Sequence, residues 1–417
     1  MVLFNLVDTY FVGQIGSLEL AALSFTFPVI MVIASLAGGL GMGSAALISH
    51  AIGRESHKEV KRLTTDSIIL SLLFVILFAV VGILTIDPLF TLLGAGPDVL
   101  PLIHSYMFIW YAGVSFVVIP MVGNNAIRAT GDTKTPALIM LAGVVVNAIL
   151  DPILIFGMFG FPAMGIEGAA IATVFSRFLT LLIAIWFLYF KEDMITLRIP
   201  PLRELWDSWK QILHLGLPSA GTRMVFPIAI GIIMGLIAEY GNEAVAAFGI
   251  ASKIEFLALT IVISLATALG PFVGQNWAAG KHKRVREGIV YSEKVSIGIG
   301  LIFFVILAVF AAPIASLFTD NPAIISATTL YLLVVPVCYG LLGIFIISTI
   351  VLNTIKRPLT SVALSLVQMF ILYLPLAYVG SVYFGLLGIF AGISLAFIIS
   401  GIISKGVLMA VLAKKGE

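Results

Sequence analysis

The sequence predicts an all-α membrane protein, because it carries too few charges for a water-soluble surface and its apolar stretches are long enough to cross a bilayer. Hydrophobic residues make up 60% and charged residues 11% of the 417 positions, and the mean hydropathy is +1.15. Soluble domains carry about 25% charged residues. About 20 apolar residues span a bilayer as a helix, which satisfies its own backbone hydrogen bonds in lipid. The stretches do not alternate with a period of two, so a β-barrel is not indicated.

Twelve apolar segments are predicted as transmembrane helices. They are 1–15, 19–50, 64–86, 99–126, 135–157, 165–190, 213–240, 244–276, 288–318, 323–354, 359–381 and 385–412. At 1.5 Å per residue the first segment falls well short of the roughly 30 Å hydrocarbon core. We therefore expect the native first helix to be truncated here at its N-terminus.

The distribution of Lys and Arg predicts the orientation. Most of the 23 basic residues lie in alternate connections between the predicted helices. These connections are 53–62, 128–134, 191–210, 280–286, 356–357 and the C-terminal 414–415. The opposite turns contain no Lys or Arg. Because basic loops stay on the cytoplasmic side, the sequence predicts a multi-pass plasma-membrane protein with these loops and the C-terminus in the cytoplasm.

An internal repeat of about 220 residues predicts two lobes. Gly16–Ala22 resembles Gly241–Ala247, and Gly165–Gly168 resembles Gly385–Gly388. Six helices per copy give both copies the same orientation, which predicts two pseudo-symmetric six-helix lobes of a transporter. The predicted division is an N-terminal lobe at 1–190, a cytoplasmic linker at 191–210 and a C-terminal lobe at 211–417.

Several function classes are disfavoured by what the sequence lacks. The single cysteine, Cys338, gives no disulfide framework, and the sequence holds no nucleotide-binding motif, metal-ligand cluster or catalytic triad. The basic runs are short and follow the topology, which argues against nucleic-acid binding. We therefore expect neither an enzyme nor a bound cofactor, and we predict a monomer that contacts membrane lipids.

Ionisable residues inside a membrane are costly and mark candidate functional sites. Asp8 lies about one and a half turns inside the outer end of the first predicted helix, and Asp151 lies at a similar depth in the fifth. Asn147 precedes Asp151 by four residues and shares its helix face. Thr173 and Tyr106 fall at the same level of the sixth and fourth helices. These five polar side chains predict a cation-binding cluster in the first lobe.

Two chemistries are open for this cluster. A carboxyl pair in a low-dielectric site can hold and release one proton. Alternatively, the oxygens of Asp8, Asn147, Asp151 and Thr173 could bind Na⁺. Tyr106, Asn147 and Asp151 are also predicted to line a substrate cavity. The structural alternatives are that Asp8 and Asp151 stabilise kinked helices, that Asn147 and Thr173 join helices, and that Tyr106 is an interfacial aromatic residue.

Four further charges lie inside predicted helices. Arg177, Arg223, Lys253 and Glu255 are each expected to pair with another helix or to face a cavity, and the sequence favours structural pairing. Lys253 and Glu255 are two residues apart, so they do not share a helix face.

Several motifs, in order along the chain, resemble those of the multidrug and toxic compound extrusion (MATE) family. They are Val7–Gly16 with Leu20–Ala22, Arg128–Thr133 with Pro136, Asn147 to Asp151-Pro152, Gly168–Thr173, and Gly274–Asn276 with Gly280. The resemblance implies a secondary exporter of organic cations or other amphiphiles, working as an antiporter against H⁺ or Na⁺.

The sequence departs from the family pattern in two places. The upstream half of the first helix is missing, and the second-lobe acidic pair of the NorM-like branch is not evident around 213–240 or 366–369. The pattern therefore resembles the DinF-like branch, in which the coupling carboxylates lie in the first lobe. A lipid or lipid-linked glycan flippase of the same superfamily remains the alternative; few basic residues in the spans disfavour it.

Overall fold

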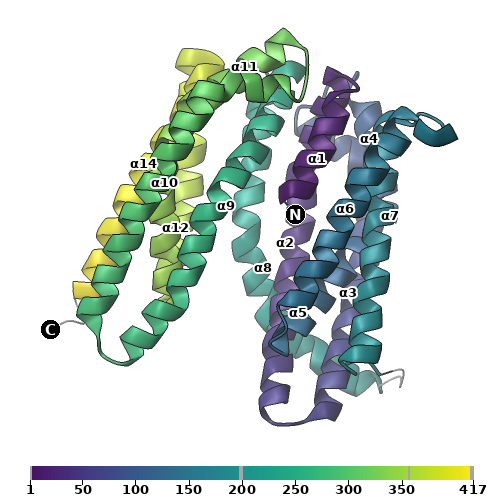
Figure 1. The fold of residues 1–417 in the computed structure, drawn as a ribbon, viewed down its shortest axis with the longest axis vertical. Helices are drawn as coiled ribbons and strands as arrows, with labels where there is room; N and C mark the ends of the chain where they lie inside the picture. The colour runs from purple at the N-terminus through teal and green to yellow at the C-terminus, as the bar shows by residue number, and fades with distance from the viewer. Residues whose placement is uncertain (1, 197–200, 356, 414–417) are drawn as a thin grey trace. The chain divides into compact units, whose positions relative to one another are not determined.

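The computed structural model describes residues 2–196, 201–355 and 357–413, and these ranges contain helices and no strand (Figure 1). The chain forms two compact units, Leu3–Ile228 and Ala229–Glu417. The boundary between them lies inside helix α8, which begins at Leu202, within the predicted linker. The division into lobes at 1–190, 191–210 and 211–417 therefore remains a prediction.

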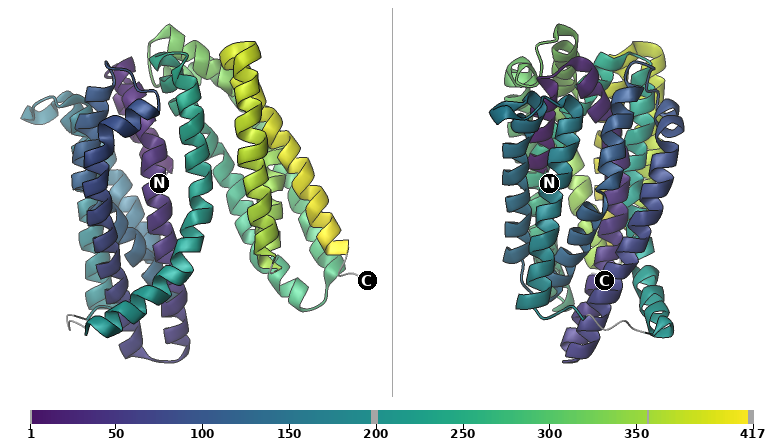
Figure 2. Two further views of the ribbon diagram at one scale, coloured as in Figure 1. Left: turned by 180° about the vertical axis from the view of Figure 1, so that it is seen from behind. Right: turned by 90° about the vertical axis from the view of Figure 1, so that its right-hand side faces the viewer.

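The first unit is a bundle whose helices run roughly alongside one another (Figure 2). Its elements are α1 (Val2–Gly13), α2 (Ser17–Gly53), α3 (His57–Leu92), α4 (Leu100–Ala112), α5 (Ser115–Ala129), α6 (Lys134–Phe156), the 3₁₀ turn η1 (Met158–Gly160), α7 (Gly165–Trp186), the π segment η2 (Phe187–Lys191) and the first part of α8 (Leu202–Ala238).

The second unit follows the same order of long and broken helices. Its elements are the end of α8, α9 (Asn242–Ala278), α10 (His282–Ser316), α11 (Pro322–Val334), the 3₁₀ turn η3 (Val335–Cys338), α12 (Tyr339–Thr354), α13 (Pro358–Leu366), the π segment η4 (Val367–Tyr373) and α14 (Leu374–Ala413).

Breaks within helices explain why fewer than twelve long helices are observed in the described ranges although twelve membrane spans are predicted. Nine helices in the described ranges are long and apolar enough to cross a membrane, or ten if α4 and α5, which meet at a 48° bend, form one span. The α13–η4–α14 run counts as one of these, yet Gly385 breaks it with φ 61° and ψ −141°, a conformation open mainly to glycine. Residues 358–384 and 386–413 are thus two helices, and α1 is the short first one.

The repeat predicted from sequence is visible in the element lengths. Helices α2 and α9 each have 37 residues, and α3 and α10 have 36 and 35. The bent α4–α5 pair in the first unit corresponds to α11–η3–α12 in the second. The stretches α1–η2 and α8–α14 therefore carry the same succession of helices.

Small residues bring α8 against α2 in the first unit. A Cβ built on Gly39 would lie 2.5 Å from the Cβ of Ala220, and one on Gly43 would lie 2.6 Å from the carbonyl oxygen of Ile212. Trp209 also donates from Nε1 to the backbone oxygen of Asp66 on α3 at 3.0 Å. Close backbone approach of this kind is a common basis for helix association in lipid.

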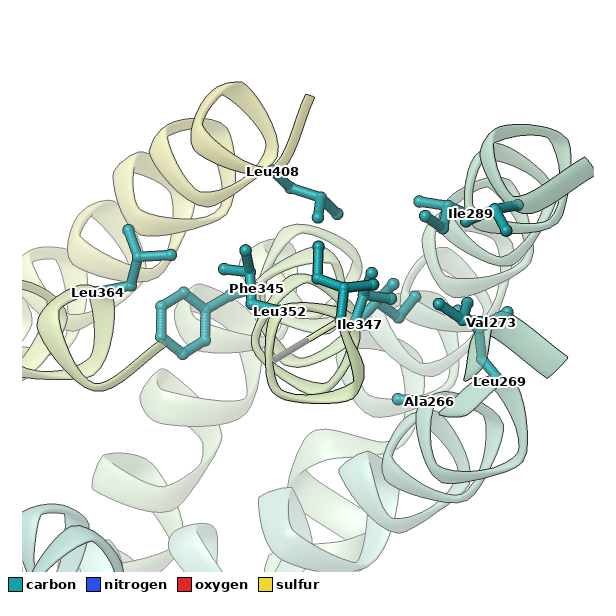
Figure 3. Packing of buried hydrophobic residues seen from close by; sticks show 12 residues of the cluster. Ala266, Leu269, Val273, Ile289, Phe345, Ile347, Leu352, Leu364 and Leu408 are labelled. Atoms are coloured by element: carbon teal, nitrogen blue, oxygen red, sulfur yellow. The ribbon is translucent and has the colours of Figure 1, made fainter. Parts of the chain in front are cut away.

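Helix α12 lies at the centre of an apolar cluster in the second unit (Figure 3). Phe345, Ile347 and Leu352 of α12 pack with Val273 of α9 and Leu408 of α14. Its other members are Ala266, Leu269, Val285, Ile289, Val351, Ile355 and Leu364. In lipid this packing stabilises the unit through close contact, because the hydrocarbon around it is as apolar as the side chains.

Gly300 of α10 is a point where side-chain size decides stability. A Cβ there would lie 2.3 Å from the backbone nitrogen of Gly340 on α12, whereas a Cβ on Gly298 of the same helix meets nothing within 4 Å. We expect Gly300→Leu to destabilise the second unit by about 3 kcal/mol or more, because backbone cannot yield as a side chain can. Thermal unfolding of the purified protein measures this. The matched variant Gly298→Leu should melt like the wild type, and equal melting of both variants would contradict the packing.

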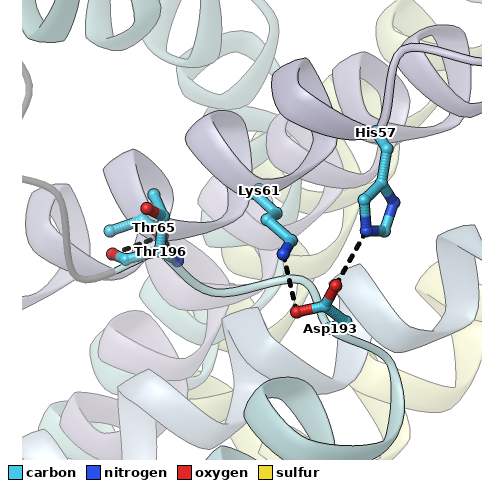
Figure 4. Close-up of polar contacts among 5 residues, drawn as sticks. All are labelled: His57, Lys61, Thr65, Asp193 and Thr196. Atoms are coloured by element: carbon cyan, nitrogen blue, oxygen red, sulfur yellow. Dashed lines mark hydrogen bonds and ion pairs between the residues drawn. The ribbon is translucent and has the colours of Figure 1, made fainter.

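The connection after α7 is fastened to the start of α3 (Figure 4). Asp193 accepts hydrogen bonds from Lys61 Nζ at 2.6 Å and from His57 Nε2 at 3.1 Å, and the backbone nitrogen of Thr196 donates to Thr65 Oγ1 at 3.0 Å. The Lys61 bond, followed by the His57 bond, holds the pKa of Asp193 below its usual value. Because the pKa of Asp193 is lowered, its carboxylate is charged at neutral pH and holds the connection to α3. This stabilising contribution is lost as the pH falls through the pKa of Asp193 in the folded protein.

The basic connections of the first unit lie at one end of its bundle. The α2–α3 turn lies there (Figure 1), and Asp193, just after η2, is tied to the start of α3 by its ion pair with Lys61. Asp132 begins α6 by accepting from the backbone nitrogens of Lys134 at 2.9 Å and Thr135 at 3.0 Å, and the Thr135 hydrogen bonds hold its pKa below the usual range. Of the basic residues used for the topology, Arg198, Lys356, Lys414 and Lys415 lie outside the described residues.

Candidate cation-coupling site

The two predicted carboxylates meet in the first unit. Asp8 projects from α1 and Asp151 from the second-to-last turn of α6, and they are 6% and 0% exposed. Their carboxyl groups lie within hydrogen-bonding reach of each other. Two charged carboxylates repel each other at this separation, so the pair is stable with a proton or another cation shared between them.

Two polar neighbours orient the pair. Asn147 Nδ2 donates to Asp151 Oδ1 at 3.0 Å from one turn earlier on α6, and Thr173 Oγ1 of α7 donates to Asp8 Oδ2 at 3.4 Å. Tyr106 of α4 is 2% exposed and lies within hydrogen-bonding reach of Thr173. Its hydroxyl group also interacts electrostatically with the carboxyl groups of Asp8 and Asp151. The structure therefore brings all five side chains together from α1, α4, α6 and α7.

The cluster has oxygen atoms left over for a cation. Asp151 Oδ2 and Asn147 Oδ1 are buried and have no hydrogen-bond partner within the described ranges. Pro152 follows Asp151 inside α6 and lacks an N–H, so the carbonyl oxygen of Ala148 loses its usual helical donor. These oxygens and the Asp8 carboxylate suit either a shared proton or a bound Na⁺. Buried acceptors without donors are costly unless such a ligand arrives.

The further buried charges lie in different surroundings. Arg177 is one turn from Thr173 on α7, where it interacts electrostatically with Asp8 and Tyr106. In the second unit Glu255, 8% exposed, accepts from Tyr331 Oη at 2.6 Å and from Tyr339 Oη at 3.5 Å. Lys253 is 3% exposed on the same helix. Glu255 therefore pairs with hydroxyl groups of α11 and α12, as the structural interpretation expects.

Sequence reasoning passed over two buried carboxylates. Glu293 of α10 is 2% exposed and forms an ion pair with Lys405 of α14 at 2.8 Å. Asp66 of α3 is fully buried beside Ser208 of α8. Both lie near the basic ends of the predicted helices 64–86 and 288–318, and only their inward-facing helix positions distinguish them from solvated charges.

Comparisons with known proteins agree on one family. The family model described as MatE matches residues 1–153 and 218–379. The FAD transporter of Shewanella oneidensis is 38% identical over 399 residues, covering 96% of this chain and 88% of that protein. The probable multidrug resistance protein NorM of Thermotoga maritima is 28% identical over 405 residues, covering 94% and 84%.

Solved structures give the same result for the fold. A multidrug resistance MATE family transporter of the MOP superfamily, in an inward-facing conformation, superposes with a TM-score of 0.92 and 28% sequence identity, covering 100% of this chain and 96% of that chain. An outward-facing structure so described superposes with a TM-score of 0.75 and 29% identity, covering 99% and 93%. These relatives have twelve transmembrane helices in two lobes, which confirms the predicted fold class.

Proposed function

We propose that this chain, which belongs to the multidrug and toxic compound extrusion (MATE) family, exports small amphiphilic molecules in exchange for H⁺ or Na⁺ bound at Asp8 and Asp151. Members of this family are multi-pass transporters of the plasma membrane and not enzymes. The observation that carries the proposal is the buried carboxyl pair, held within hydrogen-bonding reach by α1 and α6.

The cluster explains how cation binding could drive a conformational change. Asp8 ties α1 to α6 through Asp151 and to α7 through Thr173. A proton or a Na⁺ ion at this point replaces repulsion between the carboxylates with attraction, so it changes how firmly α1 packs on the bundle. A membrane potential adds about 2.3 kcal/mol per inward charge per 100 mV, which supports export against a gradient.

Two substrate classes follow from the relatives and are proposed here for this chain. Organic cations and other amphiphiles are suggested by relatives named as multidrug resistance proteins. FAD is the second candidate, because the Shewanella oneidensis relative with 38% identity over almost the whole chain is named as its transporter. Flipping of a lipid or lipid-linked glycan remains the alternative activity.

The orientation, with the basic loops and C-terminus in the cytoplasm, remains part of the proposal. It is supported by the common end at which the basic connections of the first unit lie (Figure 1). We also propose that the chain works as a monomer surrounded by membrane lipids.

Gradient-driven transport in proteoliposomes tests the proposal. The vesicles are loaded with ethidium, norfloxacin or FAD, and a proton gradient and a Na⁺ gradient are imposed separately. We expect efflux of at least one compound under one gradient and none from protein-free vesicles. Efflux at the same rate with and without either gradient would contradict cation coupling. If the protein transported none of the three compounds but moved lipids between the two leaflets, the flippase activity would be established instead.

A further inference from the structure

One cavity of the first unit gathers three positively charged side chains. Its volume is about 330 Å³, within the range of small-molecule sites, and it is lined by α2, α5, α6, α7 and α8. Three guanidinium groups line it: Arg128 from the end of α5, Arg177 from α7 and Arg223 from α8. No aspartate or glutamate is among its lining residues.

Two of the three arginines, Arg128 and Arg223, are not neutralised by an ion pair within the described ranges that would explain them structurally. Neither Arg128 nor Arg223 has a carboxylate within 4.0 Å in the part of the chain that the structure describes. Arg223 contacts the sulfur of Met42 at 2.9 Å, and a thioether is only a weak acceptor. Arg177 interacts electrostatically with the carboxylate of Asp8. Cationic groups gathered at one cavity favour an anion there.

The rest of the wall suits an aromatic or otherwise apolar body. Met42, Met121 and Met140 line the cavity, and methionine side chains adapt to varied shapes. Asn124 is 6% exposed, and its side-chain oxygen has no hydrogen-bond partner within the described ranges. That amide is available to a polar edge of a bound ring. The cavity thus combines a cationic pole, a flexible apolar wall and one orienting amide.

We propose that this cavity binds the phosphate or pyrophosphate group of an anionic aromatic amphiphile, with Arg128 and Arg223 as its main ligands. Guanidinium forks pair with phosphate oxygens through two parallel hydrogen bonds, which ammonium groups cannot do. The inference rests on the proposed export function and assigns its substrate class: a phosphorylated anion rather than an organic cation. A cation would meet three positive charges here.

The anion cavity adjoins the carboxyl cluster. Arg177, on its wall, lies one turn from Thr173, which donates to Asp8. Tyr106, Asn147 and Asp151 are not among the residues that line this cavity, so their predicted contact with substrate stays a prediction. Arg177 is also unsuitable as a test position, because its replacement would disturb Asp8.

A flavin series tests the site without any gradient. Riboflavin, FMN and FAD share one ring system and differ in having no phosphate, one phosphate and a pyrophosphate. Their binding to the full-length protein in nanodiscs is followed by flavin fluorescence. We expect FAD to bind most tightly and riboflavin at least tenfold more weakly, and Arg128→Gln and Arg223→Gln should each weaken FAD binding about tenfold while leaving riboflavin unchanged.

Controls separate the site from general effects. Arg54→Gln removes an equal charge outside the cavity and should leave FAD binding unchanged, while Arg223→Lys keeps the charge and should lose part of the affinity. Thermal unfolding checks that the variants are folded. Equal wild-type affinities for FAD and riboflavin, or equal losses in Arg54→Gln, would overturn the proposal. If FAD binding depended on Arg128 and Arg223 but neither gradient drove FAD transport, the binding site would be supported and the export function would be contradicted.

Discussion

Asp151→Asn and Asp8→Asn should each reduce gradient-driven export to the level of protein-free vesicles. Asparagine has the size of aspartate and keeps hydrogen bonds at the Asn147 and Thr173 positions, but it can neither take up a proton nor offer an anionic oxygen to Na⁺. Because the two carboxyl groups are within hydrogen-bonding reach, one amide also removes the partner that makes sharing a cation favourable. Initial efflux rates under the effective gradient, at equal protein density, measure the loss.

The same two variants should unfold at or above the wild-type temperature. Removing one buried carboxylate relieves the repulsion within the pair, so a purely structural role predicts a stability loss and the coupling role does not. Thr173→Val is the matched comparison, because it keeps both carboxylates, removes the hydroxyl that donates to Asp8 at 3.4 Å and lies near Tyr106, and should slow export by only a few-fold. Wild-type export by Asp151→Asn would remove the carboxyl pair from the mechanism.

The helical fold could be predicted from the sequence because few backbone structures satisfy all their hydrogen bonds inside a lipid bilayer. A chain with 11% charged residues must place helices in the bilayer, and the basic loops mark where each pair of helices ends. The predicted segments correspond to the observed helices, including the bent α4–α5 pair and the division at Gly385. The start of α8 at Leu202 was missed, because Pro200-Pro201 and the polar residues after it resemble a linker although a helix can begin directly after proline.

The candidate site was predictable for a related reason. Depth in the membrane follows from counting residues along each helix, so Asp8, Asp151 and Thr173 could be placed at one level. Counting residues along each helix does not predict which faces of different helices pack against each other. The arginine cavity depends on α8 packing against α2 through Gly39 and Ala220, which brings Arg223 to the same space as Arg128. Two arginines so far apart along the chain carry no sequence signal for such a contact, and each arginine alone looks like a structural charge.

An inside-negative membrane potential should accelerate FAD efflux, and should accelerate it more than the efflux of a monovalent organic cation. A pyrophosphate carries about two negative charges at neutral pH, so outward movement is favoured by about 4.6 kcal/mol per 100 mV. That amount corresponds to about three decades in the accumulation ratio. A cation moving outward is opposed by about 2.3 kcal/mol per 100 mV unless coupled cations enter. Coupled cations that enter shift both voltage dependences in the same direction, so FAD efflux should respond to an inside-negative potential more steeply than the efflux of a monovalent cation.

The measurement uses FAD-loaded proteoliposomes in which a potassium gradient and valinomycin set the potential to either sign. Proton and Na⁺ gradients are absent and the FAD concentration gradient is the same in every sample, so voltage is the only driving force that is varied. Inward movement of coupled cations in an antiporter adds to the charge carried by FAD and strengthens the expected acceleration. Efflux independent of voltage would mean that about two cations leave with each FAD molecule, which contradicts antiport. Faster efflux at inside-positive potential would require more than two, and an Arg128→Gln/Arg223→Gln variant should show little FAD efflux at either sign if the cavity is the transport site.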